Sequence, residues 1–219
     1  MKMLIVLFLS LSSLTFSYTE TAPQVPKIAA TKASSTITPK EALNKLMEGN
    51  IRYTEDHPLH ADSGKERREA TKSSQTPFAV ILGCSDSRVA PEILFDQGVG
   101  DLFVIRVAGN VAGSAELDSI AYAIKNLGSS VVMVLGHKNC GAIKATMDGQ
   151  LTEADALGAL IKPALKNCSE LKNCIEANIE HVVQQITKST LIGPHIANGE
   201  ISIVGAYYDL GTGKVKLLN

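Results

Sequence analysis

The sequence contains no tryptophan, no excess of charge of either sign and no long apolar run after residue 17. Its 219 residues carry 21 Lys and Arg against 22 Asp and Glu, a formal net charge of -1. Because a near-neutral chain has little attraction for a phosphate backbone, nucleic acid is not expected as a partner. Without a second apolar run, we expect no membrane span in the mature protein. The 45% of hydrophobic residues is sufficient for one globular domain with an ordinary core.

The first 17 residues have the pattern of a secretory signal peptide. Lys2 supplies a positive charge, an uncharged apolar stretch follows, and Thr15 and Ser17 are small residues suited to cleavage before Tyr18. The alternative, a retained membrane anchor, needs a longer run to span a bilayer. We therefore expect residues 1–17 to be a signal peptide, 18–37 a flexible leader and 38–219 a single domain of an exported, periplasmic protein.

The chain has few cysteines, and they fall into two kinds. Cys168 and Cys174 form an even pair that an oxidising compartment could join. Six residues apart on a continuous helix they would lie on different faces, so a disulfide requires a break between them, and the sequence leaves this open. Cys84 and Cys140 instead lie beside Asp or His at strand ends, as metal-ligating cysteines do.

Order is expected to begin with a helix at Thr38. Thr38 can cap it, with Pro39 at the first helical position and Glu41 completing a capping box. The helix carries one apolar stripe, formed by Ala42, Leu43, Leu46 and Met47. This stripe must pack on a surface, either of its own domain or of a neighbouring subunit.

From Phe78 onward, apolar strands alternate with amphipathic helices. Strands are predicted at 78–83, 102–107, 130–135, 201–208 and 214–218, and helices at about 114–127, 141–147, 153–166 and 171–188. Continuous apolar strands joined by helices indicate an α/β fold with a mostly parallel open sheet flanked by helices. The turn at 211–213 adds an antiparallel C-terminal edge hairpin, and the N-terminal helix forms an extended arm.

Two of these strands end in metal-ligand side chains. Cys84 follows one, and His137 and Cys140 follow another. Ligand sites of open α/β sheets lie outside the carboxyl ends of the strands, so we expect the two ends to meet. Two thiolates and an imidazole suit Zn²⁺, with a fourth position left free.

Asp86 and Arg88 follow Cys84 at a spacing of two, so an extended loop could point all three to one side. Arg88 can hold a carboxylate bidentately. Asp86 could then accept a hydrogen bond from a metal-bound hydroxide, or fill the fourth metal position itself. The alternative is a surface ion pair of little consequence.

These residues carry a resemblance to a known family. CSDSRV at 84–89 and GHKNCG at 136–141, with DLFVIRVAGN at 101–110 and VGAYYD at 204–209, resemble the β-class carbonic anhydrases from about Glu41 to Leu218. The resemblance implies reversible hydration of CO₂ to bicarbonate and a proton, at one Zn²⁺ per chain held by Cys84, His137 and Cys140. Asp86 and Arg88 match the family's pair that orients the zinc-bound hydroxide; in an inactive state the family's Asp ligates zinc.

The resemblance also implies a substrate pocket and an oligomer. Gln75, Phe103 and Tyr122 match substrate-binding positions of plant-like members, and Val89 would add to the apolar wall. The bicarbonate-inhibited members use a Trp-containing site, which a chain without Trp lacks. A homodimer or homotetramer is expected, with the helix at 39–50 lying across its partner.

Other residues receive no catalytic role. Gly109-Asn110 and Gly141-Ala142 are interpreted as close-packed backbone positions near the site. No proton shuttle is assigned among the four remaining histidines, which are His57, His60, His181 and His195.

Two other functions remain open at this point. A relative on the same scaffold could hydrolyse CS₂ or COS, since the same hydroxide can attack those carbons. A non-catalytic zinc or thiol-redox protein would instead cycle Cys84 and Cys140 to a disulfide and would tolerate Asp86→Asn.

Overall fold

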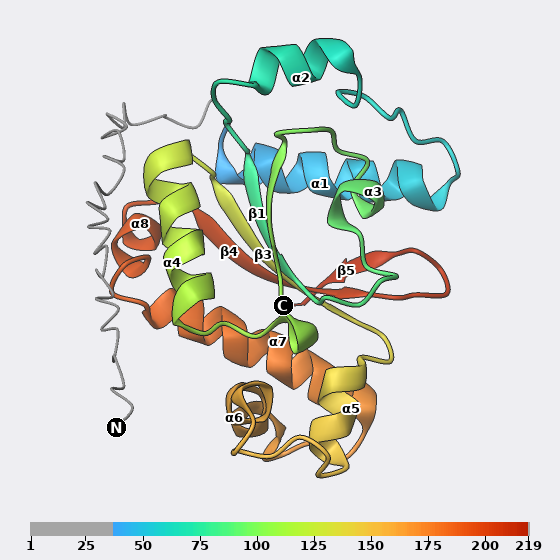
Figure 1. Cartoon of the computed structure of the whole chain (residues 1–219), viewed down its shortest axis with the longest axis vertical. Helices are drawn as coiled ribbons and strands as arrows, with labels where there is room; N and C mark the ends of the chain where they lie inside the picture. The colour runs from blue at the N-terminus through green and yellow to red at the C-terminus, as the bar shows by residue number, and fades with distance from the viewer. Residues whose placement is uncertain (1–36, 219) are drawn as a thin grey trace, which may run out of the picture.

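A five-stranded sheet forms the centre of the protein in a computed structural model that describes residues 37–218. The strand order is β2-β1-β3-β4-β5, parallel except for the antiparallel pair of β4 and β5 (Figure 1). The strands are β1 (Ala79–Gly83), β2 (Leu102–Arg106), β3 (Val131–His137), β4 (Ser202–Tyr208) and β5 (Val215–Leu217). The predicted α/β class, parallel sheet and C-terminal antiparallel edge are confirmed.

Helices cover both faces of the sheet. One face packs against α1 (Pro39–Thr54) and α3 (Pro91–Leu94), and the other against the helices between β2 and β4 (Figure 1). These are α4 (Ser114–Tyr122), α5 (Gly141–Met147), α6 (Ala156–Ile161), α7 (Leu171–Lys188) and α8 (Gly193–Ala197), while α2 (Lys65–Thr71) buries no residue. The helix predicted at 114–127 continues beyond α4 as a π turn (Ala123–Leu127), and that predicted at 153–166 is α6 with a 3-10 turn (Lys162–Leu165).

The two cores alternate along the strands, as the period of two in a β-strand requires. In β1, Val80 and Leu82 face the α4–α8 side, whereas Ala79 and Ile81 face the α1 side. All five β1 residues are buried, because both faces of the sheet are covered. This is the physical reason that the strand appears in the sequence as an uninterrupted apolar run.

Helix α1 packs on its own sheet. The predicted capping box of Thr38 and Glu41 is present, and the stripe residues Ala42 and Leu46 are fully buried in the core below β1 and β3. The Asn50 side chain adds three long-range hydrogen bonds to backbone groups, donating to Leu94 O and Gly213 O and accepting from Val215 N. These two stripe residues therefore pack on the chain's own domain, which is one of the two surfaces that the sequence allows for the stripe.

Cys168 and Cys174 form a disulfide. Cys168 lies in the segment that precedes α7, and Cys174 is in the first turn of that helix, so the break that a bridge requires is present. Cys84 and Cys140 are free thiols.

Two sequence predictions fall partly or wholly outside the described residues. The signal peptide at 1–17 lies outside them, as does the leader at 18–37 except for its last residue. Within residues 37–218, no helix is long and apolar enough to cross a membrane.

Candidate metal centre

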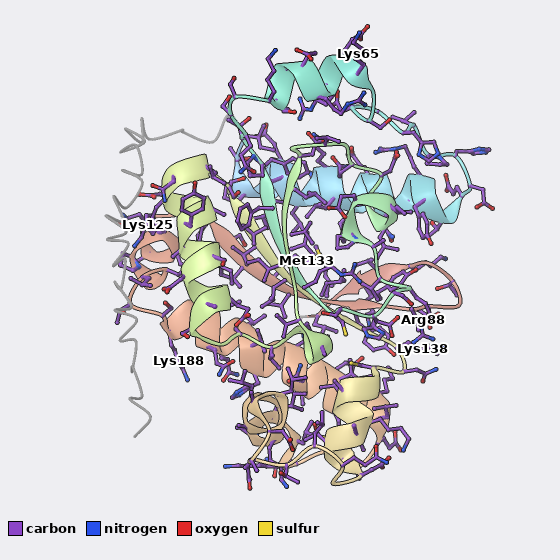
Figure 2. The ribbon with its side chains drawn as sticks, in the orientation of Figure 1. Lys65, Arg88, Lys125, Met133, Lys138 and Lys188 are labelled. Atoms are coloured by element: carbon purple, nitrogen blue, oxygen red, sulfur yellow. A yellow bond between two sulfur atoms is a disulfide. The ribbon has the colours of Figure 1, made fainter. Side chains whose placement is uncertain are left out.

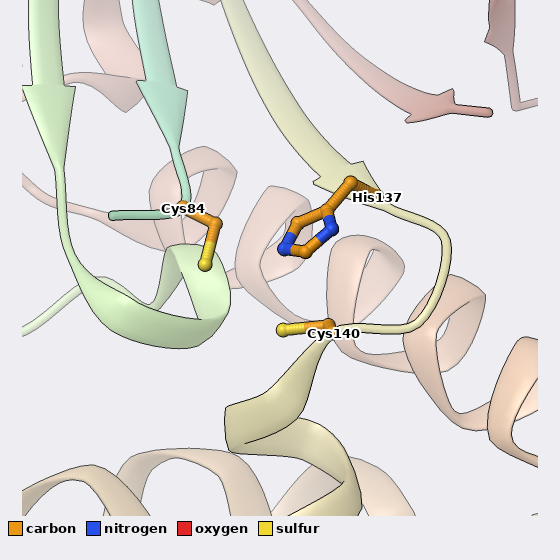
Figure 3. Close-up of side chains that lie close together, drawn as sticks. All are labelled: Cys84, His137 and Cys140. Carbon is orange, nitrogen blue, oxygen red and sulfur yellow. The ribbon is translucent and has the colours of Figure 1, made fainter. Parts of the chain in front are cut away.

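The ends of β1 and β3 place three ligand-type side chains together. Cys84 directly follows β1, His137 is the last residue of β3, and Cys140 directly precedes α5 (Figure 3). Their ligand atoms all lie within 4.8 Å of one another, and all three residues are buried. The sequence placed the end of this strand at residue 135, which is wrong, because Gly136 and His137 still pair with Tyr207 and Tyr208 of β4.

The His137 ring is oriented for metal binding. Its Nδ1 lies 2.9 Å from the carbonyl oxygen of Lys138, which can only accept, so Nδ1 carries the proton and donates. Nε2 then presents its lone pair, is buried and has no hydrogen-bond partner. Lys138 is itself held, because its backbone N–H donates to Tyr208 O. A buried, unpaired nitrogen aimed between two thiols is the arrangement that a metal ligand requires.

The two sulfurs are in different electrostatic states. The contact with the Cys140 thiol lowers the pKa of Cys84 to about 4, helped by the N–H of Gly109, which donates to Cys84 Sγ at 3.3 Å. The same contact, together with burial, raises the pKa of Cys140. The contact between the two sulfurs therefore favours deprotonation of one of them, and the thiolate is the form in which cysteine binds metals.

This donor set fits zinc. Zn²⁺ prefers tetrahedral coordination by sulfur and nitrogen, and three protein ligands leave one position for water or substrate, as in catalytic sites. Structural sites are closed by a fourth protein ligand. Within residues 37–218, the other two cysteines are joined in a disulfide and are not available as ligands.

Asp86 lies beside the cluster and is held by Arg88. Its Oδ1 accepts from Arg88 N at 3.0 Å and Nε at 2.9 Å, and its Oδ2 accepts from Arg88 Nη2 at 2.7 Å. These bonds keep the pKa of the Asp86 carboxyl well below its usual range. The same Oδ2 is 3.8 Å from His137 Nε2, so the carboxylate lies next to the candidate metal ligands. Figure 2 places Arg88 at the same side of the molecule as Lys138, away from Met133 in the middle of the sheet.

Arg106 also holds this loop, a role that sequence reasoning missed. Its Nε donates to the carbonyl oxygen of Cys84 at 3.0 Å, and its Nη2 donates to that of Asp86 at 2.6 Å. Arg106 ends β2 and pairs in register with Gly83, so its position places it beside residue 84. The sequence did contain a signal for this role: Arg106 is a charged residue that ends an otherwise apolar strand, at the edge of the sheet where ligands bind.

Three of the four predicted pocket residues, Gln75, Phe103 and Tyr122, lie away from the cluster within one chain. Phe103 pairs with Val80, which lies four residues before Cys84 and thus about 13 Å along the strand. Tyr122, at the far end of α4, lies near Phe103, with ring centroids 6.3 Å apart. Gln75 precedes β1 and is exposed, whereas Val89 is fully buried in the core on the α1 side.

The predicted glycine positions have different roles. Gly109 has a φ of +74°, and a Cβ there would lie 3.0 Å from Ile161 Cδ1, so close packing is confirmed at this residue. At Gly141 a Cβ would meet no atom within 4 Å, so the expectation of close packing is wrong there. The residue is instead the first of α5, directly after a ligand-type cysteine.

Comparisons with known proteins identify the family. A family model described as "Carbonic anhydrase" matches residues 79–215. A carbonic anhydrase of Mycolicibacterium smegmatis is 39% identical over 192 residues, which cover 82% of this chain and 93% of that protein. The β-carbonic anhydrase CcaA has a similar structure, with a TM-score of 0.65, 25% identity and coverage of 81% and 95% of the two chains. A Coccomyxa β-carbonic anhydrase, solved with acetazolamide, gives a TM-score of 0.63, 26% identity and coverage of 80% and 86%. This chain belongs to the β-class carbonic anhydrase family, whose cofactor is zinc.

Proposed function

We propose that residues 38–219 form one domain that catalyses the reversible hydration of CO₂, with Cys84, His137 and Cys140 holding zinc. The observation that carries this proposal is the unpaired Nε2 of His137, buried between two thiols with a carboxylate 3.8 Å away. When bound, zinc supplies the Lewis acidity that makes a coordinated water a source of hydroxide near neutral pH.

Asp86 orients the attacking oxygen in this proposal. As a carboxylate it accepts hydrogen bonds and donates none, so it fixes the direction in which the oxygen's proton points. Cys84 and Cys140 as thiolates would give zinc more charge than neutral imidazoles and so weaken its effect as a Lewis acid, which would make the Asp86 acceptor beside it more useful.

Arg88 decides where that carboxylate lies. Three hydrogen bonds engage both Asp86 oxygens, which favours a carboxylate turned toward Arg88 over one that occupies the fourth metal position. Arg106 adds to this preference, because it fixes the backbone on both sides of Ser85.

A second copy of the chain completes the substrate pocket. Gln75, Phe103 and Tyr122 lie toward the amino ends of the strands, whereas the metal ligands lie at the carboxyl ends. β2 is an edge strand, and Tyr122 is 48% exposed, so this surface is accessible to another subunit. In a symmetric dimer each copy supplies these residues to the site of the other.

The protein is exported in this proposal. The signal-peptide pattern at residues 1–17 supports it, as does the Cys168–Cys174 disulfide, since disulfides persist mainly in oxidising compartments.

The test is stopped-flow CO₂ hydration by residues 18–219, with zinc measured on the same sample. We expect one zinc per chain and activity that Cys84→Ser abolishes together with the metal. Asp86→Asn should keep the zinc and lower turnover by about 100-fold, the usual scale of a positioned acid or base. Zinc-loaded protein without hydration between about pH 6.5 and 9 would refute the proposal, and unchanged function in Asp86→Asn would favour the metal-binding or thiol-redox reading.

A further inference from the structure

The buried face of α7 is apolar except at one position. Its other buried residues are Cys174, Ile175, Ile179, Val182 and Ile186, whereas Asn178 is an amide with 0% exposure. The Oδ1 atom of Asn178 has no hydrogen-bond partner. Burying an amide with one side unsatisfied costs free energy, so its single hydrogen bond needs an explanation beyond packing.

That hydrogen bond leads to the metal cluster. Asn178 Nδ2 donates to the carbonyl oxygen of Gly109 at 2.9 Å, and the N–H of Gly109 donates to Cys84 Sγ at 3.3 Å. The two bonds use the two peptide groups on either side of the Gly109 Cα. Asn178, 69 residues away in sequence, therefore lies two hydrogen bonds from a metal-ligand sulfur.

The Gly109 segment needs such an anchor because its conformation is unusual. Gly109 and Asn110 both have positive φ, of 74° and 45°. Positive φ is unfavourable for a residue such as Asn110, so surrounding contacts must hold the turn. The next residue of α7, Ile179, packs against Gly136, where a Cβ would lie 2.6 Å from Ile179 Cδ1. Adjacent residues of α7 thus contact the segment that donates a hydrogen bond to Cys84 and the strand end that carries His137.

We propose that Asn178 is a positioning residue for the metal site: its amide holds Gly109 so that the Gly109 N–H points at the sulfur of Cys84. The inference rests on the proposed role of Cys84 as a ligand. Hydrogen bonds to ligating groups fix their orientation and tune the charge that they donate to the metal. Loss of this bond loosens the cysteine and leaves its sulfur a stronger electron donor.

The test measures metal binding and the electronic state of the sulfur, independently of activity. Asn178→Leu keeps the branched shape of the side chain and removes the donor, and Asn178→Ala serves if leucine, whose methyl groups are larger, does not fold. Zn²⁺ titration against a chromophoric chelator should show an affinity about 10- to 100-fold lower than wild type. In the Co²⁺-substituted protein, the thiolate-to-cobalt charge-transfer band should move to longer wavelength.

Val182→Ala is the matched control, because it truncates a buried α7 side chain one turn away that cannot donate a hydrogen bond. It should lower stability and leave the affinity and the band unchanged. A wild-type band with no change of affinity or wavelength in the Asn178 variants would overturn this inference alone, as would equal changes in Val182→Ala. A wild-type protein with no thiolate-to-cobalt band would overturn the proposed ligand set, and this inference with it.

Discussion

At the scale of single residues, two arginines hold the loop that follows β1 in different ways. Arg88 engages the Asp86 side chain, whereas Arg106 engages the backbone carbonyls of Cys84 and Asp86. The planar guanidinium suits both tasks, because it presents several donors in a fixed geometry. Arg106 thus holds the position of the loop, and Arg88 holds the direction of the Asp86 carboxylate. The two roles can be tested independently.

Removal of the Arg88 side chain should affect turnover and leave the metal in place. Arg88→Ala removes the two guanidinium hydrogen bonds to Asp86 and leaves Oδ1 only the backbone N–H of residue 88, while the ligand residues and the Arg106 contacts remain. We expect full zinc content and a kcat lower by about 10- to 100-fold, the range for loss of a partner that orients a functional group. The measurement is stopped-flow hydration with zinc quantified on the same protein.

Lys144→Ala provides the control, because Lys144 of α5 forms an exposed i,i+4 pair with Asp148, the residue that follows the helix. Such pairs contribute little, so its kcat should equal that of wild type. Loss of zinc from Arg88→Ala would contradict the prediction, since it would make Arg88 a structural residue of the metal site.

At the scale of elements, the sequence predicted those whose burial is continuous or periodic. β1 is an unbroken apolar run, and α7 repeats its apolar residues every three or four positions, so both were located within one residue of their observed ends. The sequence did not predict α2, α3 or α8. α2 buries no residue and so carries no apolar stripe, while α3 and α8 span four and five residues, too few for a periodic signal.

The contacts that tertiary structure adds could not be predicted in the same way. β3 continues to His137 because β4 pairs with it there, which no local pattern indicates. The three residues of the candidate metal cluster were predicted because their residue types are chemically specific. Asn178 and Arg106 were not, because an amide on a helix and an arginine at a strand end acquire their roles only from partners 69 and about 20 residues away.

Asp96 joins the segment after α1 to the end of α3. Its buried carboxylate accepts hydrogen bonds from Arg52 Nε at 2.6 Å, Leu59 N at 3.0 Å and His60 N at 3.0 Å. Burial alone would raise its pKa, but these three donors outweigh burial and lower the pKa below the ordinary 3.8. The carboxylate therefore stabilises the folded protein when it is ionised.

Asp96→Asn should lower the free energy of unfolding at pH 7 by about 2 kcal/mol, the scale for hydrogen bonds to a charged group. Because the folded pKa is depressed, this stabilisation is present above the ordinary pKa and is lost as the pH falls through the folded pKa. The difference in the free energy of unfolding between wild type and variant should therefore shrink below about pH 4, as measured by urea unfolding across pH.

Asp56→Asn, on the exposed part of the same segment, is the control. Its free energy of unfolding should stay within about 0.5 kcal/mol of the wild-type value at every pH. A difference between Asp96→Asn and wild type that does not depend on pH would contradict the argument.

At the scale of the whole molecule, the two halves of the proposed site lie toward opposite ends of the sheet. Cys84, His137 and Cys140 gather where β1 and β3 end, whereas Gln75 precedes β1 and Tyr122 lies at the far end of α4. In the proposed dimer, each copy supplies its pocket residues to the metal site of the other. Dimers that contain two different variants can therefore distinguish a site shared between two chains from a site formed within one chain.

Two inactive variants should restore each other's activity when they form mixed dimers. Cys84→Ser removes a metal ligand, and the double variant Gln75→Ala/Tyr122→Ala removes pocket side chains that are exposed in the single chain. In a mixed dimer, the intact metal site of the second chain receives the intact pocket residues of the first. Random assortment makes about half of the dimers mixed, each with one complete site of two. About a quarter of wild-type activity should therefore return after the two variants are denatured and refolded together.

Cys84→Ser mixed with Cys140→Ser is the control. This mixture should recover no activity, because both changes damage the half of the site that stays within one chain. Mixed dimers verified by mass but without activity would show that Gln75 and Tyr122 do not serve the partner's metal site.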